Sequence, residues 1–401
     1  MASSRGSQRR VVVVGGSLGG LNAALWLREA GCRVEVFERT PVLLEDRGVG
    51  IVLNPATIQY FVSHTTTNLK EISAATSWFR YMNPDGRIAH EEFTPYRLTG
   101  YSPLSAGLLR CFGEEHYHRG EECIGFDEDS GHLTLCFATG RVESCDLLVF
   151  ADGINSTGRR LLLPEIQPRY AGYAAWRGMI AEHDLSSGTF SSLHEAITYA
   201  ILPDSHALTY PIPDRVGRVG PRHRMTNWLW YRNISSGREL DDLVTGRDGI
   251  RFGTSVPPNS VQEHHVRRLR EEAHALPPAF SEMIAKTAEP FIQVVFDVEV
   301  PRMAFGRVCL IGDAAFTARP HAAAGTAKAA EDGRQLGQAV AASAGDVEDA
   351  LKQWEPGQLA LGRQLVMRSR DAGERLQHGR WSVGESLSFG LYRPGDSIFI
   401  E

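Results

Sequence analysis

The sequence predicts an α/β protein with three parts: a parallel-sheet domain, an inserted domain built on a mixed β-sheet, and a C-terminal helical region. Three observations predict this fold. A β-branched run at Val11–Val14 precedes a glycine-rich turn and a helical pattern. Residues 170–232 are rich in Tyr, Trp and Pro and have the texture of antiparallel or mixed strands. Residues 321 to about 376 are Ala-rich and then helical in pattern.

Composition narrows the class of protein. The 401 residues are 42% hydrophobic and 22% charged, which suits a large globular core. The net charge of -6 and the lack of a basic run argue against a nucleic-acid partner. The six cysteines form no C-x-x-C pair, so we expect neither a metal site nor a redox dithiol. We expect no signal peptide and no membrane span, and hence a cytoplasmic protein.

The first element is a βαβ unit. Val11–Val14 is a continuous apolar run, as expected for a strand buried on both faces of a parallel sheet. Leu21–Ala30 contains good helix formers, and Gly31 is suited to the position that ends the helix. Arg33–Glu38 alternates as a second strand. About 30 residues therefore complete one unit of a Rossmann-like sheet.

The turn between Val14 and the helix matches a dinucleotide fingerprint. Gly15 makes the tight turn and Gly20 allows close packing of helix on strand, while Ser17 replaces the glycine that lies against the pyrophosphate. The serine hydroxyl can compensate by donating to a phosphate oxygen. Glu38 ends the second strand, where a carboxylate accepts from a free ribose 2′-hydroxyl and repels a 2′-phosphate. The pattern favours FAD or NAD over NADP.

Two distant segments distinguish between FAD and NAD. One strand ends in Asp152-Gly153, and another ends before Asp313, which can accept hydrogen bonds from ribityl hydroxyls. The small residues of Ala323–Ala327 allow the backbone to lie against a flat ring. The helix that begins there directs its positive end toward the part of a flavin that becomes anionic on reduction. Together these segments predict a Rossmann-like FAD-binding domain.

The three predicted parts are discontinuous along the chain. We assign residues 8–76, 97–165 and 290–345 to the FAD-binding domain. Residues 77–96 and 166–289 form the substrate-binding sheet domain, and residues 346–401 form the C-terminal helix and tail.

The motifs resemble a known family. The stretches GGSLGGL, YAGYAAWRG, YPIP, RPHAAAGTAKAAEDG and RLQHG are similar to those of the FAD-dependent aromatic hydroxylases. These are single-component flavoprotein monooxygenases of the para-hydroxybenzoate hydroxylase type. The resemblance covers approximately residues 10–393, and the RPHAAAG stretch points to a subgroup acting on hydroxypyridines. Three residues depart from the wider family pattern. Ser17 and Ala323 each replace a glycine, and Ala327 stands where many relatives have asparagine.

The resemblance also implies roles for individual residues. The pyrophosphate would lie against Gly15, Ser17, Leu18 and Gly20, and the adenosine ribose against Glu38 and Arg39. Gly48, Val49 and Gly50 would run beside the isoalloxazine, Cys123 would touch adenine, and Arg110 would meet the diphosphate. Asp152 would bridge FAD and the reduced nicotinamide, and Asp313 would bind ribityl. The pyrimidine edge would lie against Ala323, Ala324, Gly325, Thr326 and Ala327.

The reaction implied by the family has two halves. NADH or NADPH, bound transiently because no second fingerprint exists, reduces a tightly bound FAD. The reduced flavin reacts with O2 to a C4a-hydroperoxide, which hydroxylates a small hydroxylated aromatic or N-heteroaromatic ring such as a dihydroxypyridine. The family also implies a homodimer. Two alternatives stay open: a flavoprotein oxidase or dehydrogenase on the same scaffold, and a non-catalytic FAD-binding module.

The hydroxylation needs a group that removes a proton from the ring hydroxyl. His321 is the first candidate for this base because histidine titrates in the useful range and follows Pro320 near the flavin. Tyr210 is the second, as an orienting hydroxyl. For Trp228 and Trp230 we expect packing in the core, with pocket lining as the alternative. For Arg177 we expect a structural ion pair or a position at a strand end, with substrate binding as the alternative.

Overall fold

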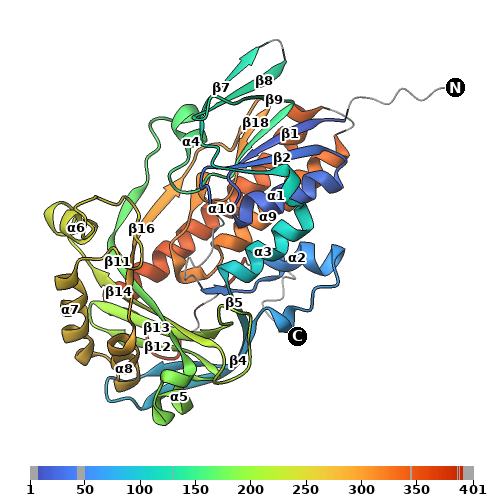
Figure 1. Cartoon of the computed structure of the whole chain (residues 1–401). Helices are drawn as coiled ribbons and strands as arrows, with labels where there is room; N and C mark the ends of the chain where they lie inside the picture. Colours follow the sequence, from blue (N-terminus) through green and yellow to red (C-terminus); the bar gives the residue numbers. More distant parts are fainter. Residues whose placement is uncertain are drawn as a thin grey trace.

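The computed structural model describes residues 8–42, 50–129, 131–343, 346–385, 387 and 389–391. Two sheets organise the chain, a smaller one near the N-terminus and a larger one at the opposite end of the molecule (Figure 1). Helices α9 (Gly325–Ala342) and α10 (Val347–Gln377) lie between the sheets. The predicted α/β fold with a Rossmann-type domain, a mixed sheet and C-terminal helices is confirmed.

The smaller sheet has the strand order β17-β18-β10-β1-β2-β6. All its pairings are parallel except that of β17 with β18. Its strands are β1 (Arg10–Val14), β2 (Arg33–Glu38), β6 (Tyr117–Arg119), β10 (Leu147–Phe150), β17 (Ala304–Phe305) and β18 (Val308–Leu310). Helices α1 (Leu18–Glu29), α2 (Pro55–His64) and α3 (Tyr101–Phe112) accompany it. Val11, Val12 and Val13 are fully buried, as expected for a parallel strand covered on both faces.

Close packing joins α1 to α9 across 300 residues of chain. A Cβ on Gly333 would lie 2.7 Å from the backbone of Ala23, and one on Gly337 would lie 2.7 Å from the carbonyl oxygen of Trp26. The two glycines therefore let the helices approach more closely than larger residues would allow. This contact holds the late segment of the chain against the first βαβ unit.

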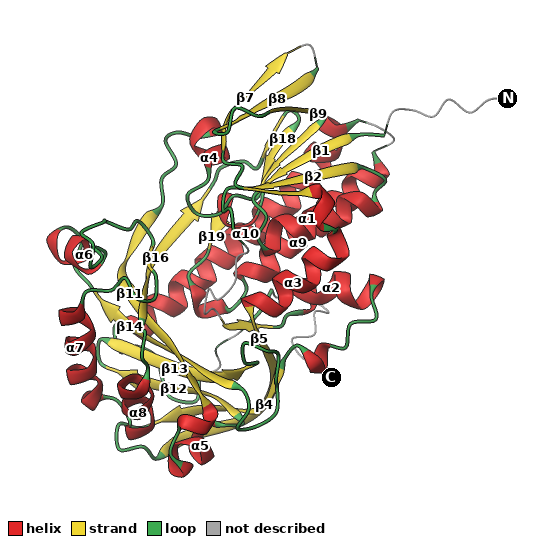
Figure 2. Cartoon of the chain, in the orientation of Figure 1, coloured by secondary structure: helices red, strands yellow, loops and turns green. Residues whose placement is uncertain are grey.

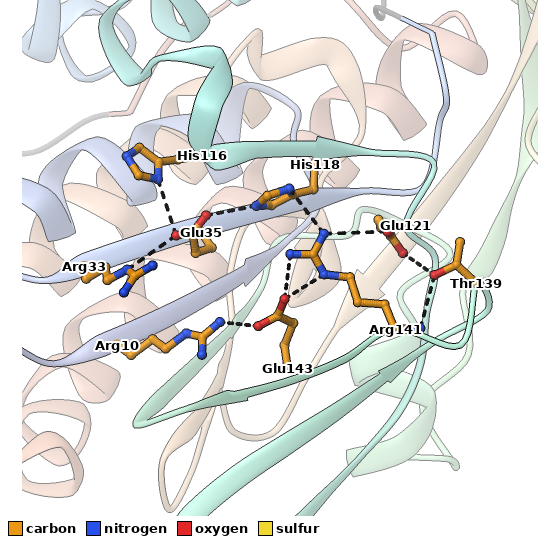
Figure 3. A network of polar contacts seen from close by, with 9 residues as sticks. All are labelled: Arg10, Arg33, Glu35, His116, His118, Glu121, Thr139, Arg141 and Glu143. Atoms are coloured by element: carbon orange, nitrogen blue, oxygen red, sulfur yellow. Dashed lines mark hydrogen bonds and ion pairs between the residues drawn. The ribbon is translucent and has the colours of Figure 1, made fainter.

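A three-stranded sheet extends the nucleotide-binding part at β7 (Cys123–Asp129), β8 (His132–Phe137) and β9 (Val142–Cys145). A polar network ties it to β2 and β6 (Figure 3). Glu35 on β2 pairs with His116 and His118, and Arg141 links Glu143 to Glu121. Burial disfavours the Glu35 carboxylate, but its hydrogen bonds with His118 and His116 hold its pKa below the usual range. The network positions Glu121, which lines the cleft described below.

The larger sheet is mixed, with the order β15-β16-β11-β14-β13-β12-β4-β5-β3 and with β19 paired to β16. Its strands are β3 (Gly50–Val52), β4 (Ala74–Met82), β5 (Ile88–Gly100), β11 (Arg169–Ala181), β12 (Ala196–Leu202), β13 (Ser205–Ile212), β14 (Met225–Asn233), β15 (Ser255–Val256), β16 (Phe291–Glu299) and β19 (Phe316–Thr317). Its outer face carries α5 (Ser187–Leu193), α7 (Glu263–Glu272) and α8 (Pro278–Lys286) (Figure 2). Trp228 and Trp230 pack into that outer core, as expected.

The short helical elements complete the chain. They are α4 (Thr157–Leu162), α6 (Arg238–Leu243), η1 (Leu69–Glu71), η2 (Glu114–His116), η3 (Glu182–Asp184), η4 (Ala273–Ala275), η5 (Gly312–Ala314) and η6 (Pro320–Ala322). None of the helices in the described ranges has an apolar stretch suited to crossing a membrane.

The two sheets interleave more along the chain than the expected ranges indicate. β16 (Phe291–Glu299) and β3 (Gly50–Val52) lie within segments that we assigned to the FAD-binding domain, yet both pair within the larger sheet. The apolar run of β16 is compatible with either sheet, so its strand partners could not be read from its composition. Much of the expected C-terminal tail lies outside the described residues.

Candidate functional site

A cleft of about 850 Å³ lies between the two sheets. On one side it is lined by residues at the carboxyl ends of β1, β2 and β10, which are Gly15, Ser17, Glu38, Arg39, Ala151 and Asp152. On the other side it is lined by residues of the larger sheet, which include Ala175, Tyr231, Phe291, Gln293 and Val295. Open parallel sheets bind nucleotides in a crevice outside the carboxyl ends of their strands, and the cleft occupies that position.

The glycine-rich turn has the backbone geometry that a phosphate site needs. Gly15 has φ of +105°, and a Cβ there would lie 2.4 Å from the carbonyl oxygen of Ala151. A Cβ on Gly20 would lie 1.8 Å from the carbonyl oxygen of Gly15. Helix α1 begins at Leu18, three residues earlier than predicted. Its first N–H groups and its positive dipole end therefore start directly at the turn.

Ser17, the residue that departs from the fingerprint, has a partner that the sequence did not suggest. It is the N-cap of α1, but its side chain makes no capping hydrogen bond. Its Oγ lies 2.9 Å from the hydroxyl of Tyr101, the first residue of α3. The tyrosine thereby holds the serine hydroxyl beside the turn.

We expect Tyr101→Phe to weaken FAD binding about 2- to 10-fold, because a neutral hydrogen bond contributes roughly 0.5–1.5 kcal/mol. Titration of apoprotein with FAD in a calorimeter measures the change. Tyr60→Phe is the matched control, since the Tyr60 hydroxyl donates to Glu29 instead of to a residue of the turn. Equal FAD affinities of Tyr101→Phe and wild type would refute the role given to this contact.

Glu38 supports the turn as well as facing the cleft. Its Oε2 accepts from the N–H of Gly16 at 2.8 Å, and its Oε1 accepts from the N–H of Thr40 at 2.9 Å. Each carboxylate oxygen keeps a second lone pair for a ribose hydroxyl. Arg39 is exposed beside it, and Cys123 is buried at the start of β7; both line the cleft. The structure thus brings the predicted adenosine-side residues together.

Asp152 lies where the second motif meets the cleft. Its Oδ2 accepts from the N–H groups of Thr157 and Gly158, at 2.7 and 3.2 Å. Its Oδ1 is buried and has no hydrogen-bond partner among the residues that the structure describes. Burial raises the pKa of this carboxyl, and its hydrogen bonds partly oppose that shift. An unpartnered buried oxygen in the cleft wall is suited to accept a hydroxyl or amide proton from a ligand.

Asp313 faces the cleft from η5. Its side chain is exposed to the cavity and enclosed by protein on its other sides, and this burial raises its pKa to about 6. Lys328 and Arg159 partly oppose the rise. The preceding Gly312 has φ of +57°, and its N–H donates to Asp332 at 2.9 Å. Asp332 also binds the buried ammonium of Lys328, so a buried ion pair positions the loop that carries Asp313.

The segment after Asp313 approaches the cleft through its loop. Thr317, Ala318 and Pro320 line the cleft, whereas Ala323, Ala324, Gly325, Thr326 and Ala327 are not among the lining residues. Ala323 adopts a left-handed conformation with φ of +49°, and its carbonyl oxygen accepts from Asn54. Helix α9 begins at Gly325, as the small-residue pattern predicted. The predicted contacts of Ala323–Ala327 with a pyrimidine edge remain a proposal.

Of the residues expected beside the isoalloxazine, Gly48 and Val49 lie outside the described residues. Gly50 begins β3, and its carbonyl oxygen accepts from the Tyr210 hydroxyl at 3.2 Å. Arg110 lies on the exposed face of α3 near its end and is not among the residues that line the cleft. The expected diphosphate contact of Arg110 therefore finds no support in its position, because the turn faces the beginning of α3, where Tyr101 lies.

His321 is placed differently from the sequence expectation. It is 4% exposed, is not among the residues that line the cleft, and its Nε2 lies 2.7 Å from the Tyr173 hydroxyl. A Cβ on Gly373 of α10 would lie 2.9 Å from the same Nε2, so helix α10 covers the ring. Burial, together with the nearby His206 and Arg319, holds its pKa well below the usual range. His321 is thus a neutral imidazole that is enclosed by protein and does not line the cleft.

Arg177 has surroundings that differ from the first sequence expectation. It is 4% exposed on β11, and its Nη1 donates to the side chain of Gln293, a cleft residue, at 2.6 Å. Its Nε has no hydrogen-bond partner in the described ranges. The structural ion pair expected for Arg177 is not found: within the part of the chain that the structure describes, no carboxylate lies within 4 Å of its guanidinium. A buried cation without an acidic partner in the described residues is suited to bind an anion.

One aspartate and two histidines lie close together away from the cleft, although the pattern of cysteines and histidines in the sequence suggested no such cluster. Asp242 lies near His264 and His265 at the start of α7, with its Oδ2 3.7 and 3.3 Å from the two Nε2 atoms. The aspartate and His264 are exposed. This group lies outside the residues that line the cleft.

The cleft residues fit FAD. The turn at Gly15 has no room for a side chain, and the carboxylates of Asp152 and Asp313 offer acceptor oxygens without protein partners in the described ranges. Glu38 offers further acceptor capacity at the ribose position. This donor and acceptor set suits a dinucleotide with several free hydroxyl groups.

Comparisons with known proteins agree with this geometry. Residues 170–297 match the family described as FAD binding domain-like, and residues 10–72 match pyridine nucleotide-disulphide oxidoreductase. The chain is 37% identical to 2,6-dihydroxypyridine 3-monooxygenase of Paenarthrobacter nicotinovorans, over 97% of this chain and 94% of the relative. It is 28% identical to 3-amino-4-hydroxybenzoate 2-monooxygenase of Streptomyces cremeus, over 91% of this chain and 87% of the relative. A solved structure of 2,6-dihydroxypyridine-3-hydroxylase from Arthrobacter nicotinovorans superimposes with a TM-score of 0.92 at 36% identity, covering 96% of this chain and 98% of that one.

Proposed function

The chain belongs to the family of FAD-dependent monooxygenases that includes 2,6-dihydroxypyridine 3-monooxygenase, and from this premise we propose that it hydroxylates a small anionic N-heteroaromatic ring of the dihydroxypyridine type. The observation that carries the choice of substrate is Arg177, a buried cation that donates to Gln293 and has no carboxylate partner among the described residues. A ring that has lost a hydroxyl proton supplies the missing negative charge. The same charge makes the ring a better nucleophile toward an electrophilic oxygen.

When bound, FAD would accept a hydride from NAD(P)H and activate O2. The residues proposed to hold it are those of the turn, Gly15, Ser17, Leu18 and Gly20, with Glu38, Arg39 and Cys123 on the adenosine side. Asp152 and Asp313 offer acceptor oxygens to its hydroxyl groups. The segment Ala323–Ala327 and Gly50 are proposed to lie beside the flavin ring.

The substrate ring is proposed to bind on the inner face of the larger sheet. Arg177 and Tyr210 lie on that face, and burial raises the pKa of Tyr210, so its hydroxyl stays protonated at neutral pH. Its proton is donated to the carbonyl oxygen of Gly50, so Tyr210 offers the ring an acceptor oxygen and does not act as a base. Arg177 stabilises the ring oxyanion, which lowers the need for a strong base in the site. His321 is proposed as a positioning residue that acts through Tyr173.

The test is turnover of the purified holoenzyme with 2,6-dihydroxypyridine. NADH or NADPH loss, O2 uptake and product mass are followed together. A product heavier by one oxygen atom supports the proposal. Peroxide in stoichiometric yield with no product from any hydroxypyridine supports the oxidase alternative, and FAD binding without pyridine-nucleotide oxidation supports the non-catalytic alternative.

Two further features belong to the proposal. All six cysteines are free thiols, which suits the reducing cytoplasm. A homodimer is proposed from the family resemblance, and light scattering of the purified protein tests it. A monomer at micromolar concentration would overturn that part alone.

A further inference from the structure

Asn227 is a fully buried polar residue without partners. It lies on β14 and is 0% exposed. Neither its Nδ2 nor its Oδ1 has a hydrogen-bond partner in the described part of the chain. Leaving a buried donor and a buried acceptor unpaired destabilises a folded protein, so such a group needs an explanation.

The side chain of Asn227 belongs to the inner face of the larger sheet. Successive residues of a strand point to opposite faces. Trp228 and Trp230 pack into the outer core with α8, whereas Leu229 and Tyr231 pack into the inner one. Asn227 alternates with the two tryptophans and therefore shares the face of Leu229 and Tyr231.

The register places Asn227 beside the proposed ring site. It is directly opposite Tyr210 on β13 and Met179 on β11. Arg177 is opposite Leu229, so it is the diagonal neighbour of Asn227, a relation that spans roughly 7–8 Å between Cα atoms. Gln293, which accepts from Arg177, lines the cleft. Asn227, Arg177 and Tyr210 thus converge on one patch of the inner face.

We propose that Asn227 recognises the lactam edge of a pyridone substrate and thereby selects N-heteroaromatic rings over carbocyclic phenols. This inference rests on the proposed function and names the residue that sets its substrate class. The Oδ1 accepts from the ring N–H, and the Nδ2 donates to the adjacent ring oxygen. An asparagine amide pairs in the same planar, two-bond manner with a purine edge.

The chemistry of the ring matches the three residues. A 2,6-dihydroxypyridine that has lost one proton keeps an N–H between two ring oxygens. The Asn227 amide takes the N–H and one oxygen, and Arg177 takes the other oxygen. A resorcinol ring carries a C–H in place of the N–H, so it leaves the Oδ1 buried and unpaired. A site built to pair a substrate N–H discriminates against an analogue that lacks it.

The experiment compares Asn227→Leu with wild type. Dissociation constants of 2,6-dihydroxypyridine and resorcinol for the FAD-loaded enzymes are measured from flavin absorbance changes. We expect the variant to bind the pyridine roughly 10- to 100-fold more weakly and to bind resorcinol as well as wild type or better. Its FAD content is unchanged, and its melting temperature without substrate is equal or higher, because an unpaired polar group has been removed.

Thr198→Val is the matched control. Thr198 is also fully buried with an unpartnered side-chain oxygen, but it lies on β12 with Ala196 and Ala200, on the opposite face from Ile197 and Tyr199. Its replacement is expected to leave the ratio of the two dissociation constants unchanged.

Three results would overturn the inference. Equal weakening of both rings by Asn227→Leu would indicate a general packing role. Unchanged affinity for the pyridine would show that Asn227 does not contact it. If wild-type holoenzyme binds and hydroxylates neither ring, the proposed function fails together with this inference, whereas the first two results leave the proposed function standing.

Discussion

Asp313→Ala is expected to yield protein that is largely free of FAD. The carboxylate faces the cleft without a protein partner in the described residues, so its hydrogen-bonding capacity is available to the cofactor. A hydrogen bond to a charged group contributes about 1.5–3 kcal/mol, so loss of one bond weakens FAD binding roughly 10- to 150-fold. Absorbance at the flavin band of purified protein, with titration of apoprotein, measures the loss. Wild-type occupancy would contradict the assigned role.

Asp313→Asn separates cofactor binding from structural stability. The pKa of about 6 in the folded apoprotein exceeds the usual 3.8, so the folded state binds the proton more tightly than the unfolded state. Protonation of Asp313 therefore contributes to the free energy of unfolding. This contribution is fully present below pH 4 and is lost as the pH rises through about 6. We therefore expect the Asn variant, as apoprotein at pH 8, to melt at a higher temperature than wild-type apoprotein while it binds FAD more weakly. A lower melting temperature would indicate a structural role for the carboxylate.

Arg177→Met is expected to lower the rate of ring hydroxylation about 10²- to 10³-fold. Removal of one positioned donor to a developing or bound oxyanion in a buried site has an effect of this size. Methionine keeps much of the side-chain volume, and the guanidinium has no described carboxylate that its loss would leave unpaired. The melting temperature and the FAD content are therefore expected to change little. Product formation measured by mass gives the rate.

A pH profile distinguishes substrate activation from a packing role of Arg177. In the proposed role, Arg177 stabilises the ring anion, so the wild-type enzyme is expected to bind the ionised ring at pH values below the pKa that the ring has in water. The Met variant lacks this stabilisation, and its rate is expected to rise with pH until the ring ionises in solution. Arg177→Lys keeps the charge and is expected to retain part of the shift. Identical pH profiles for wild type and the Met variant would refute the oxyanion role.

The parts of the site predicted most closely are those set by local backbone chemistry. Gly15 and Gly20 are needed because a Cβ at either position would overlap a neighbouring carbonyl oxygen. Glu38 and Asp313 follow strand ends, where the topology of a parallel sheet brings them to one cleft. Such contacts connect residues within one strand–turn–helix unit or at equivalent ends of neighbouring strands. Their positions follow from the pattern of the chain itself.

The surroundings that the sequence did not indicate depend on which segments lie together. Asn227 and Arg177 are 50 residues apart, and nothing in either strand indicates that β11 and β14 pair in this register. His321 looked suited to act as a base, but α10 covers its ring through Gly373. Arg110 looked suited to a phosphate, but α3 directs Tyr101 to the turn instead. Each of these outcomes depends on packing between distant segments.

The amino-acid sequence alone thus determined a Rossmann-like domain with an FAD site, because glycines and carboxylates at strand ends act within a few residues of their neighbours. The tertiary structure decided the features on which the proposed substrate site rests. Arg177 is a buried cation without a carboxylate partner in the described residues. Asn227 is a buried amide whose donor and acceptor atoms are both unpaired there. Burial and strand register are properties of the assembled sheet, so no local pattern could reveal them.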